Sequence, residues 1–148
     1  MDKKLNKIII ASDHAGFEMK EFIIKRMKEY DFEDIGTNSE ISVDYPDYAI
    51  KLTQQFSPKQ HSIGVLICGS GIGMSMVANR VKNIRAALCS DHKMAILARQ
   101  HNDANVLVLG SRLISEQEAI KCLLAFLNTN FDGGRHQGRL SKFNDVDL

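Results

Sequence analysis

The sequence predicts a three-layer, doubly wound α/β domain built on a five-stranded parallel sheet. Short runs rich in β-branched residues alternate with longer amphipathic stretches along the chain. Most of the short runs are continuously apolar, which is typical of parallel strands covered on both faces. The length of 148 residues fits one compact domain, and we see neither a linker nor an internal repeat. We therefore expect a single domain over residues 1–148, with a basic C-terminal tail at 132–148.

Five runs are predicted as strands. They are Lys7–Ala11, Phe32–Ile35, Ile63–Cys68, Arg85–Cys89 and Asn105–Leu109. Helical patterns separate them, so the chain forms βαβ units with right-handed crossovers. In such sheets ligands bind at the carboxyl ends of the strands, where the strand order reverses.

Five helices are predicted from the spacing of apolar residues. They are Phe17–Tyr30, Asp47–Phe56, Ile72–Arg80, Lys93–His101 and Ser115–Leu127. Asp91 is placed to cap the fourth helix, and Ser115 with Glu118 has the spacing of a capping box. Gly133 and Gly134 break the helical pattern before the basic tail.

Composition and charge exclude several classes of protein. The apolar fraction is 44% and the formal net charge is +1, which argues against disorder and against non-specific nucleic-acid binding. No apolar run approaches the roughly 20 residues of a membrane span. Three cysteines without a CxxC pair predict neither a disulfide framework nor a zinc cage. We expect a cytoplasmic protein with no nucleic-acid or membrane partner.

The segment Gly69–Gly73 is the strongest local signal. Its three glycines at alternate positions let backbone N–H groups converge on an anion at the start of a helix. A dinucleotide fingerprint needs glycine at position 74, and a phosphatase loop needs arginine there, but Met74 occupies it. The Gly-Lys-Ser/Thr ending of a Walker loop is absent as well. The alternative is a tight turn that binds nothing.

Cys68 ends the third predicted strand, directly before this loop. A cysteine in that place can be a small core residue. The helix start and its N–H groups favour the thiolate form, so Cys68 is also a candidate base. Cys89 and Cys122 lack this setting and are predicted as core residues, although Cys89 also ends a strand.

Two histidines, His14 and His101, are expected at the carboxyl edge of the sheet with Asp13, Asn102 and Asp103. Histidine titrates near neutral pH and suits proton transfer. The alternative is a pair of capping or surface residues. The spacing matches no HxH or HxxxH pattern, so we expect no metal.

The tail carries Arg135 and Arg139, four residues apart, which on a helix face the same way. Paired guanidinium groups suit a phosphate dianion, although a solvated basic terminus is the alternative. The tail follows the fifth strand, which we expect at a sheet edge, whereas the candidate site lies near the first and third strands. We therefore expect the tail to reach the site of a neighbouring subunit.

Seven segments, in order, carry a resemblance to a known family. They are Ser-Asp-His-Ala-Gly-Phe (12–17), Asp-Tyr-Pro-Asp-Tyr-Ala (44–49), Ile-Cys-Gly-Ser-Gly-Ile-Gly (67–73), Ala-Asn-Arg (78–80), Arg-Gln-His-Asn-Asp (99–103), Gly-Ser-Arg (110–112) and Gly-Gly-Arg-His (133–136). From about Ile8 to Arg139 the chain resembles the type B ribose-5-phosphate isomerases, a family shared with galactose-6-phosphate and allose-6-phosphate isomerases.

The resemblance implies a Rossmann-like fold and a homodimer or homotetramer with active sites at the subunit interface. It makes Cys68 the catalytic base, Ser70 a contact to the reacting end of the sugar, and His101 the residue that opens the furanose ring. A second branch of the family has glutamate where Met74 stands, which places this chain in the cysteine branch. The substrate-binding positions implied are Asp13, His14, Tyr45, Gly69, Ser70, Gly71, Ile72, Gly73, Asn102, Arg112, Arg135 and Arg139.

The expected activity is interconversion of ribose 5-phosphate and ribulose 5-phosphate through an enediolate, in the pentose phosphate pathway. The reaction contains no redox or hydrolytic step, so we expect no cofactor. The alternatives are an isomerase of a six-carbon sugar phosphate and a non-catalytic phosphate- or nucleotide-binding module.

Overall fold

The computed structural model describes residues 7–56 and 62–146. Its strands are β1 (Ile8–Ser12), β2 (Phe32–Asp34), β3 (Ile63–Cys68), β4 (Ala86–Leu88) and β5 (Val106–Gly110). Its helices are α1 (Phe17–Arg26), α2 (Tyr45–Gln55), α3 (Ile72–Ala78), α4 (His92–Asn102), α5 (Glu116–Asn128), α6 (Arg135–Ser141) and the short 3₁₀ helix η3 (Lys142–Asp145). None of these helices combines the length and apolar composition that crossing a membrane requires.

The five strands form one sheet in the order β2-β1-β3-β5-β4, and every neighbouring pair is parallel. This confirms the predicted fold class. From β1 the chain moves outward to β2 and then returns to β3 on the other side, so the strand order reverses between β1 and β3. Ser12 pairs with Ile67, and Cys68 pairs with Gly110. The carboxyl ends of these three central strands therefore meet where ligands bind in such sheets.

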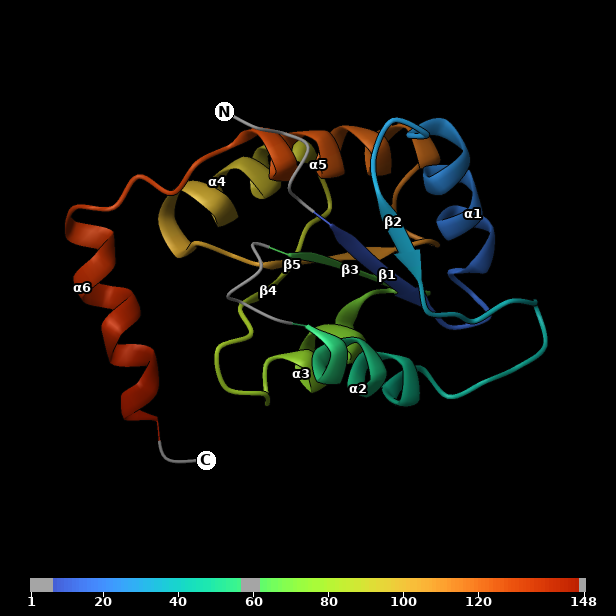
Figure 1. Ribbon diagram of the computed structural model, residues 1–148, viewed down its shortest axis with the longest axis horizontal. Helices are drawn as coiled ribbons and strands as arrows, with labels where there is room; N and C mark the ends of the chain where they lie inside the picture. Colours follow the sequence, from blue (N-terminus) through green and yellow to red (C-terminus); the bar gives the residue numbers. More distant parts are fainter. Residues whose placement is uncertain (1–6, 57–61, 147–148) are drawn as a thin grey trace.

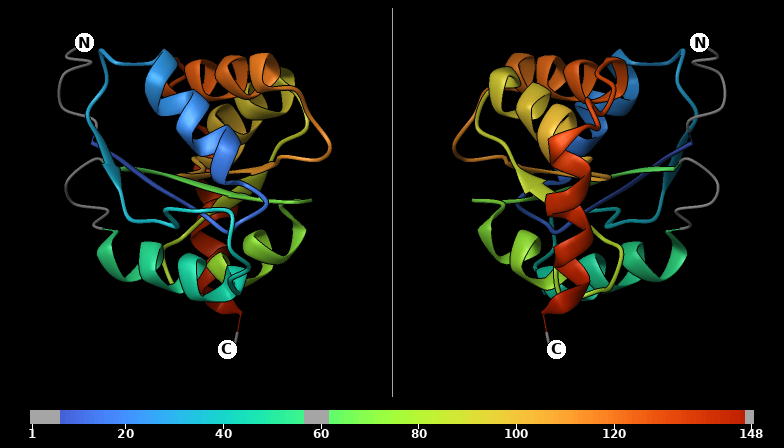
Figure 2. Two further views of the ribbon diagram at one scale, coloured as in Figure 1. Left: turned by 90° about the vertical axis from the view of Figure 1, so that its right-hand side faces the viewer. Right: turned by 90° about the vertical axis from the view of Figure 1, so that its left-hand side faces the viewer.

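Helices cover both faces of the sheet, as Figures 1 and 2 show. Helices α1, α4 and α5 lie over one face and α2 and α3 over the other, and each face has its own buried cluster. Alternate residues of β3 divide between them: Val65 and Ile67 face the first cluster, Leu66 and Cys68 the second. Fully burying one aliphatic side chain stabilises the fold by roughly 1.5–3 kcal/mol, so both faces hold the sheet.

Helix boundaries differ from the predicted ones for local reasons. Helix α1 ends at Arg26 rather than at Tyr30, because Met27 leaves the helical conformation (φ −113°, ψ 50°) while its side chain stays buried. Helix α2 begins two residues early, because Pro46 fits the first helical turn. Asp91 accepts a hydrogen bond from the Met94 N–H, as the capping prediction requires.

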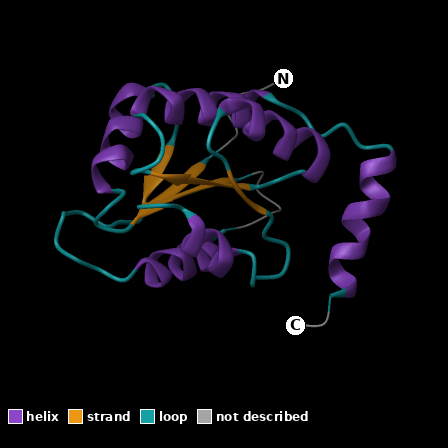
Figure 3. Ribbon diagram, turned by 180° about the vertical axis from the view of Figure 1, so that it is seen from behind, coloured by secondary structure: helices purple, strands orange, loops and turns teal. Residues whose placement is uncertain are grey.

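The tail folds into α6 and η3, which the sequence pattern did not predict. The predicted helix break is confirmed, since Gly133 and Gly134 both have positive φ. The tail does not follow an edge strand, because β5 lies between β3 and β4. Figures 1 and 3 show α6 at one end of the molecule, outside the two helical layers.

Candidate active site

The loop from β3 to α3 surrounds the Cys68 thiol with backbone. Cys68 is buried, and its Sγ accepts a hydrogen bond from the Gly71 N–H at 3.2 Å. Gly71 has φ +78°, and a Cβ there would lie 2.5 Å from Leu88 Cδ1, so only glycine fits. The Ile72 N–H donates to Ser70 Oγ at 3.2 Å. The sulfur therefore lies at the start of α3, within hydrogen-bond reach of a backbone N–H.

Residues after β1 form the next part of the carboxyl edge of the sheet. The Asp13 carboxylate is buried and accepts from the Gly16 N–H at 3.0 Å. His14 Nδ1 lies 3.1 Å from the Val43 N–H, from which it accepts a hydrogen bond. With Nδ1 occupied as an acceptor, the neutral ring carries its proton on Nε2. His14 is thus fixed as a donor from that nitrogen.

Two side chains pack against the glycine loop at positions where a Cβ would be in their way. Arg112 Nη1 lies 3.0 Å from the position of a Cβ on Gly69, and the Tyr45 ring occupies the place of a Cβ on Gly73. The structure thus brings together one large group of the predicted residues at the carboxyl edge. The group consists of Asp13, His14, Tyr45, Cys68, Gly69, Ser70, Gly71, Ile72, Gly73 and Arg112.

His101 and Asn102 lie at the opposite, amino edge of the sheet. Helix α4 starts after the carboxyl end of β4 and ends before the amino end of β5, so its last turn lies at the amino edge of the sheet. The Arg85 side chain, just before β4, bonds to the Asp103 carbonyl at 2.8 Å, which fixes this placement. The prediction that His101 and Asn102 lie at the carboxyl edge is wrong, because a helix between parallel strands must run back across the sheet. The five residues of β5, at about 3.3 Å each, put roughly 16 Å between the two edges.

At the amino edge His101 stacks on His136 of α6, with ring centroids 4.4 Å apart and planes 14° apart. The Asp132 N–H donates to the Gln100 carbonyl at 3.0 Å, which ties the start of the tail to α4. Burial, followed by the charges of His101, Arg135 and Arg139, holds the pKa of His136 below its usual value. His136 was not predicted as a site residue. Its only signal was its place beside Arg135 in the Gly-Gly-Arg-His segment.

The same cluster holds the one group of metal-ligating side chains found among the described residues. Donor atoms of His101, Asp132 and His136 lie within 4.8 Å of one another. Sequence spacing missed the group, because its members come from α4 and the tail. Arg135 and Arg139 stand beside it on α6, and their charges favour an anion over a cation here.

A cavity of about 1040 Å³ opens between the tail and the segment from α3 to β4. Its basic lining residues are Arg80, Lys82, Arg85, Arg139 and Lys142, and no acidic residue in the described part of the chain lines it. Its larger apolar lining residues are Val81, Ile84, Leu140, Phe143 and Val146. The amino edge therefore carries both an anion-attracting surface and an apolar groove.

Comparisons with known proteins show which family the chain resembles and which solved structures share its fold. Residues 8–143 match the model of the Ribose/Galactose Isomerase family. A probable ribose-5-phosphate isomerase B from Mycoplasma pneumoniae is 48% identical over 138 residues, which cover 91% of each chain. The crystal structure of a ribose 5-phosphate isomerase from Thermotoga maritima has a TM-score of 0.91 and 52% identity, and the match covers 95% of this chain and 99% of that one. Ribose-5-phosphate isomerase B from Mycoplasma genitalium with bound ribulose-5-phosphate has a TM-score of 0.82 and 43% identity over 92% of each chain.

Proposed function

The chain belongs to the Ribose/Galactose Isomerase family, and we propose how the residues at the carboxyl edge of the sheet and those at the amino edge together interconvert ribose 5-phosphate and ribulose 5-phosphate. The observation that carries the proposal is the Cys68 thiol, 3.2 Å from the Gly71 N–H at the start of α3. A relative 43% identical to this chain was crystallised with ribulose-5-phosphate.

Isomerisation moves a proton between C2 of the aldose and C1 of the ketose. The Cys68 thiolate takes the C2 proton, and the electron pair forms an enediolate with its charge on O1. A proton then passes from O2 to O1, and the thiol returns a proton to C1 as the C2 carbonyl forms. The negative charge that develops on oxygen needs donors fixed in advance. The Ser70 hydroxyl and the free N–H groups of the glycine loop supply them, and each such donor is worth about 3–4 kcal/mol. No electron or water molecule is consumed, so the reaction needs no cofactor.

Ribose 5-phosphate is mostly a closed furanose, so a separate group must open the ring before the base can act. His101 is the candidate acid/base, because the imidazole exchanges a proton near neutral pH. The phosphate is expected on His14, Arg112, Arg135 and Arg139. His14 and Arg112 lie at the carboxyl edge, whereas both tail arginines lie on α6. The four side chains of one copy therefore do not lie together at one site.

We infer that two copies of the chain complete each site. The carboxyl edge of one copy supplies the base, and the amino edge of the other supplies His101 and the tail arginines. Two apolar side chains on α3, Ile72 and Met76, are 47% and 65% exposed beside the glycine loop. They complement the apolar groove against the tail, which supports a homodimer or a tetramer built from such dimers. All three cysteines are free thiols, which supports a cytoplasmic location.

Mixing two inactive variants tests this arrangement. Cys68→Ala removes the base and His101→Ala removes the ring-opening group. In a heterodimer of the two variants one site lacks both groups and the other site is intact. Random pairing is therefore expected to restore about a quarter of the wild-type ribose 5-phosphate turnover. The control mixes Cys68→Ala with the double variant and is expected to stay inactive.

A mixture no more active than its two components would show that each site lies within one chain. The assay contains excess EDTA, so that turnover by wild type also reports the reaction without a free divalent ion. Allose 6-phosphate and galactose 6-phosphate are measured beside ribose 5-phosphate. Faster turnover of either would move the substrate to the six-carbon sugars and leave the two-copy site standing.

A further inference from the structure

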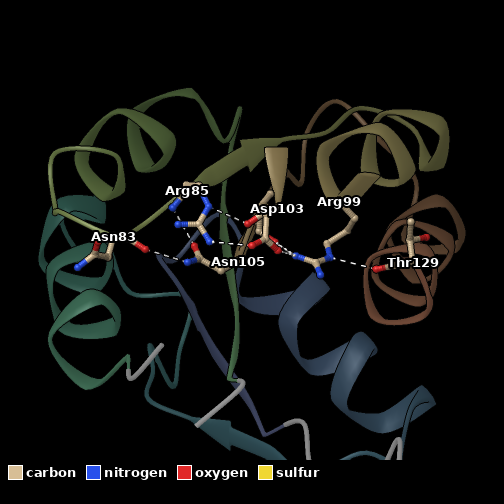
Figure 4. A network of polar contacts seen from close by, with 7 residues as sticks. Asn83, Arg85, Arg99, Asp103, Asn105 and Thr129 are labelled. Carbon is tan, nitrogen blue, oxygen red and sulfur yellow. Dashed lines mark hydrogen bonds and ion pairs between the residues drawn. The ribbon is translucent and has the colours of Figure 1, made fainter. Parts of the chain in front are cut away.

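We propose that Arg85 is a positioning residue that, with Arg99, fixes the last turn of α4 and thereby sets the place of His101. The inference rests on the proposed role of His101 in ring opening. Figure 4 shows the network that carries it, in which both guanidinium groups converge on Asp103. Asp103 lies two residues after His101 and directly after the end of α4.

Arg85 joins this helix end to the sheet. Its Nε donates to the Asp103 carbonyl at 2.8 Å, and its Nη2 lies 3.4 Å from Asp103 Oδ2. Its backbone N–H donates to Asn105 Oδ1 at 2.8 Å, and Asn105 Nδ2 donates to the Asn83 carbonyl at 2.8 Å. The segment before β4 and the segment before β5 are thus bound to each other. Arg85 is the member of this network that reaches back to the end of α4.

Arg99 joins the same helix end to α5. Its Nη1 donates to Asp103 Oδ1 at 2.9 Å and to the Ala104 carbonyl at 2.5 Å, and its Nε donates to the Thr129 carbonyl at 3.2 Å. The side chains of Arg85, Arg99 and Asp103 are 28%, 16% and 37% exposed. Charge-assisted hydrogen bonds at such partly buried positions are among the stronger ones in proteins.

The backbone of Asp103 turns the chain at the point that the two arginines hold. Its φ of +45° and ψ of +44° are left-handed, a conformation that few non-glycine residues adopt. In this conformation its N–H reaches the Ala98 and Arg99 carbonyls and ends the helix at Asn102. The two arginines bind the Asp103 carboxylate, the Asp103 carbonyl and the Ala104 carbonyl. The direction in which α4 ends, and with it the His101 side chain, is therefore set by this network.

The tail converges on the same turn. The Asp132 N–H bonds to the Gln100 carbonyl, and the His136 ring stacks on His101 at 4.4 Å. Since the network holds α4 on one side and the tail holds it on the other, a shift of this turn displaces His101 relative to His136. A displacement of about 1 Å in a catalytic group can lower a rate by as much as a hundredfold. Proton transfer at Cys68 uses the thiol and the donors of the glycine loop and does not use the His101 imidazole.

The test compares Arg85→Met, which keeps an unbranched apolar stem and removes the guanidinium donors, with Lys93→Met as a matched control. Lys93 is an exposed cation in the first turn of α4 and makes no side-chain hydrogen bond or ion pair within the described part of the chain. Two rates are measured at saturation. One is kcat from ribose 5-phosphate, which requires ring opening. The other is deuterium incorporation at C1 of ribulose 5-phosphate in D₂O, which requires only the base.

Arg85→Met is expected to lower kcat from ribose 5-phosphate about tenfold, with C1 exchange within about twofold of wild type. Lys93→Met is expected to change neither rate. Equal losses in both rates, or no loss in either, would overturn the proposal, since a merely structural role lowers both together. Should Arg85→Met fail to fold, Asp103→Asn decides, because asparagine tolerates the left-handed backbone and lacks the charge that both arginines share.

A nuclear Overhauser contact between the His101 and His136 rings separates this proposal from the proposed function. The contact is expected in wild type and Lys93→Met and is expected to be lost in Arg85→Met. If wild type turned over no ribose 5-phosphate, the proposed function would fail while this contact still decided the role of Arg85. A contact that persists in Arg85→Met at wild-type intensity would refute the positioning role.

Discussion

The two edges of the sheet are built in different ways. At the carboxyl edge the hydrogen bonds around the Cys68 thiol join groups close in sequence: Cys68, Ser70 and Gly71 bond within one loop, and Gly71 is enclosed by Leu88 and Leu109. At the amino edge the contacts join side chains far apart in sequence, such as Arg85 with Asp103 and His101 with His136.

This difference indicates which half can be altered without loss of the fold. The proposed base, Cys68, lies beside a loop that packs against the core, so the geometry of that loop and the stability of the fold are coupled. The residues proposed for ring opening and phosphate binding lie on a helix end and an outlying tail, where Arg135 and Arg139 are exposed. Variants there are expected to change catalysis more than stability. Variants in the glycine loop are expected to change both.

The largest effect is expected from Cys68→Ala. It removes the base and leaves the phosphate-binding groups in place. Both turnover of ribose 5-phosphate and C1 exchange are expected to fall by at least about a thousandfold, the range that one acid/base group supplies. The control is Cys122→Ala, which removes a buried thiol of α5 at a distance from the loop. Turnover by Cys68→Ala near the wild-type rate would assign the base to another residue.

A smaller effect concerns the free energy of unfolding, and it compares a glycine of the loop at the carboxyl edge with a glycine of α6. Gly71→Ala places a Cβ 2.5 Å from Leu88 Cδ1 in a left-handed backbone and is expected to lower the free energy of unfolding by about 3 kcal/mol. Gly138→Ala in α6 meets no atom within 4 Å and is expected to raise it by about 0.5 kcal/mol through helix propensity. Urea denaturation measures both. Equal changes at the two positions would contradict the contrast between edges.

The smallest effect concerns protonation of His136. Its pKa is lowered by burial and then by His101, Arg135 and Arg139, so the native state resists protonation more than the unfolded chain does. The resulting stability is present above the unfolded pKa of about 6.5 and is lost as the pH falls through the native pKa. His136→Gln is expected to lose less stability than wild type on acidification. NMR titration should give a midpoint for His136 below its usual value, and Arg135→Met should raise it.

The sequence predicted the sheet and the glycine loop well, because both depend on local patterns. Buried parallel strands are continuously apolar, and β3 begins and ends at the predicted residues, Ile63 and Cys68. Asp91 and Ser115 cap their helices through bonds to backbone three residues on. Such contacts are visible in sequence spacing.

The amino edge could not be predicted in the same way. His101 was expected near Cys68, but the direction of α4 between two parallel strands places it at the opposite edge. The stack on His136 and the approach of Arg85 to Asp103 join residues 35 and 18 positions apart along the chain. No local pattern encodes them, and both follow from tertiary packing. The roles of the individual site residues remain predictions that the variants above test.

The position of α6 also bears on how the protein is made. Chains are synthesised from the N-terminus, and the last strand, β5, ends at Gly110, well before the tail begins at Asp132. The sheet and the glycine loop can therefore form while the tail is still on the ribosome. A chain released early, without α6, keeps Cys68 and lacks Arg135, His136 and Arg139. If the proposed two-copy site is correct, such a fragment can supply its cysteine to a site completed by the tail of a full-length copy. It cannot supply the tail that the cysteine of the full-length copy needs.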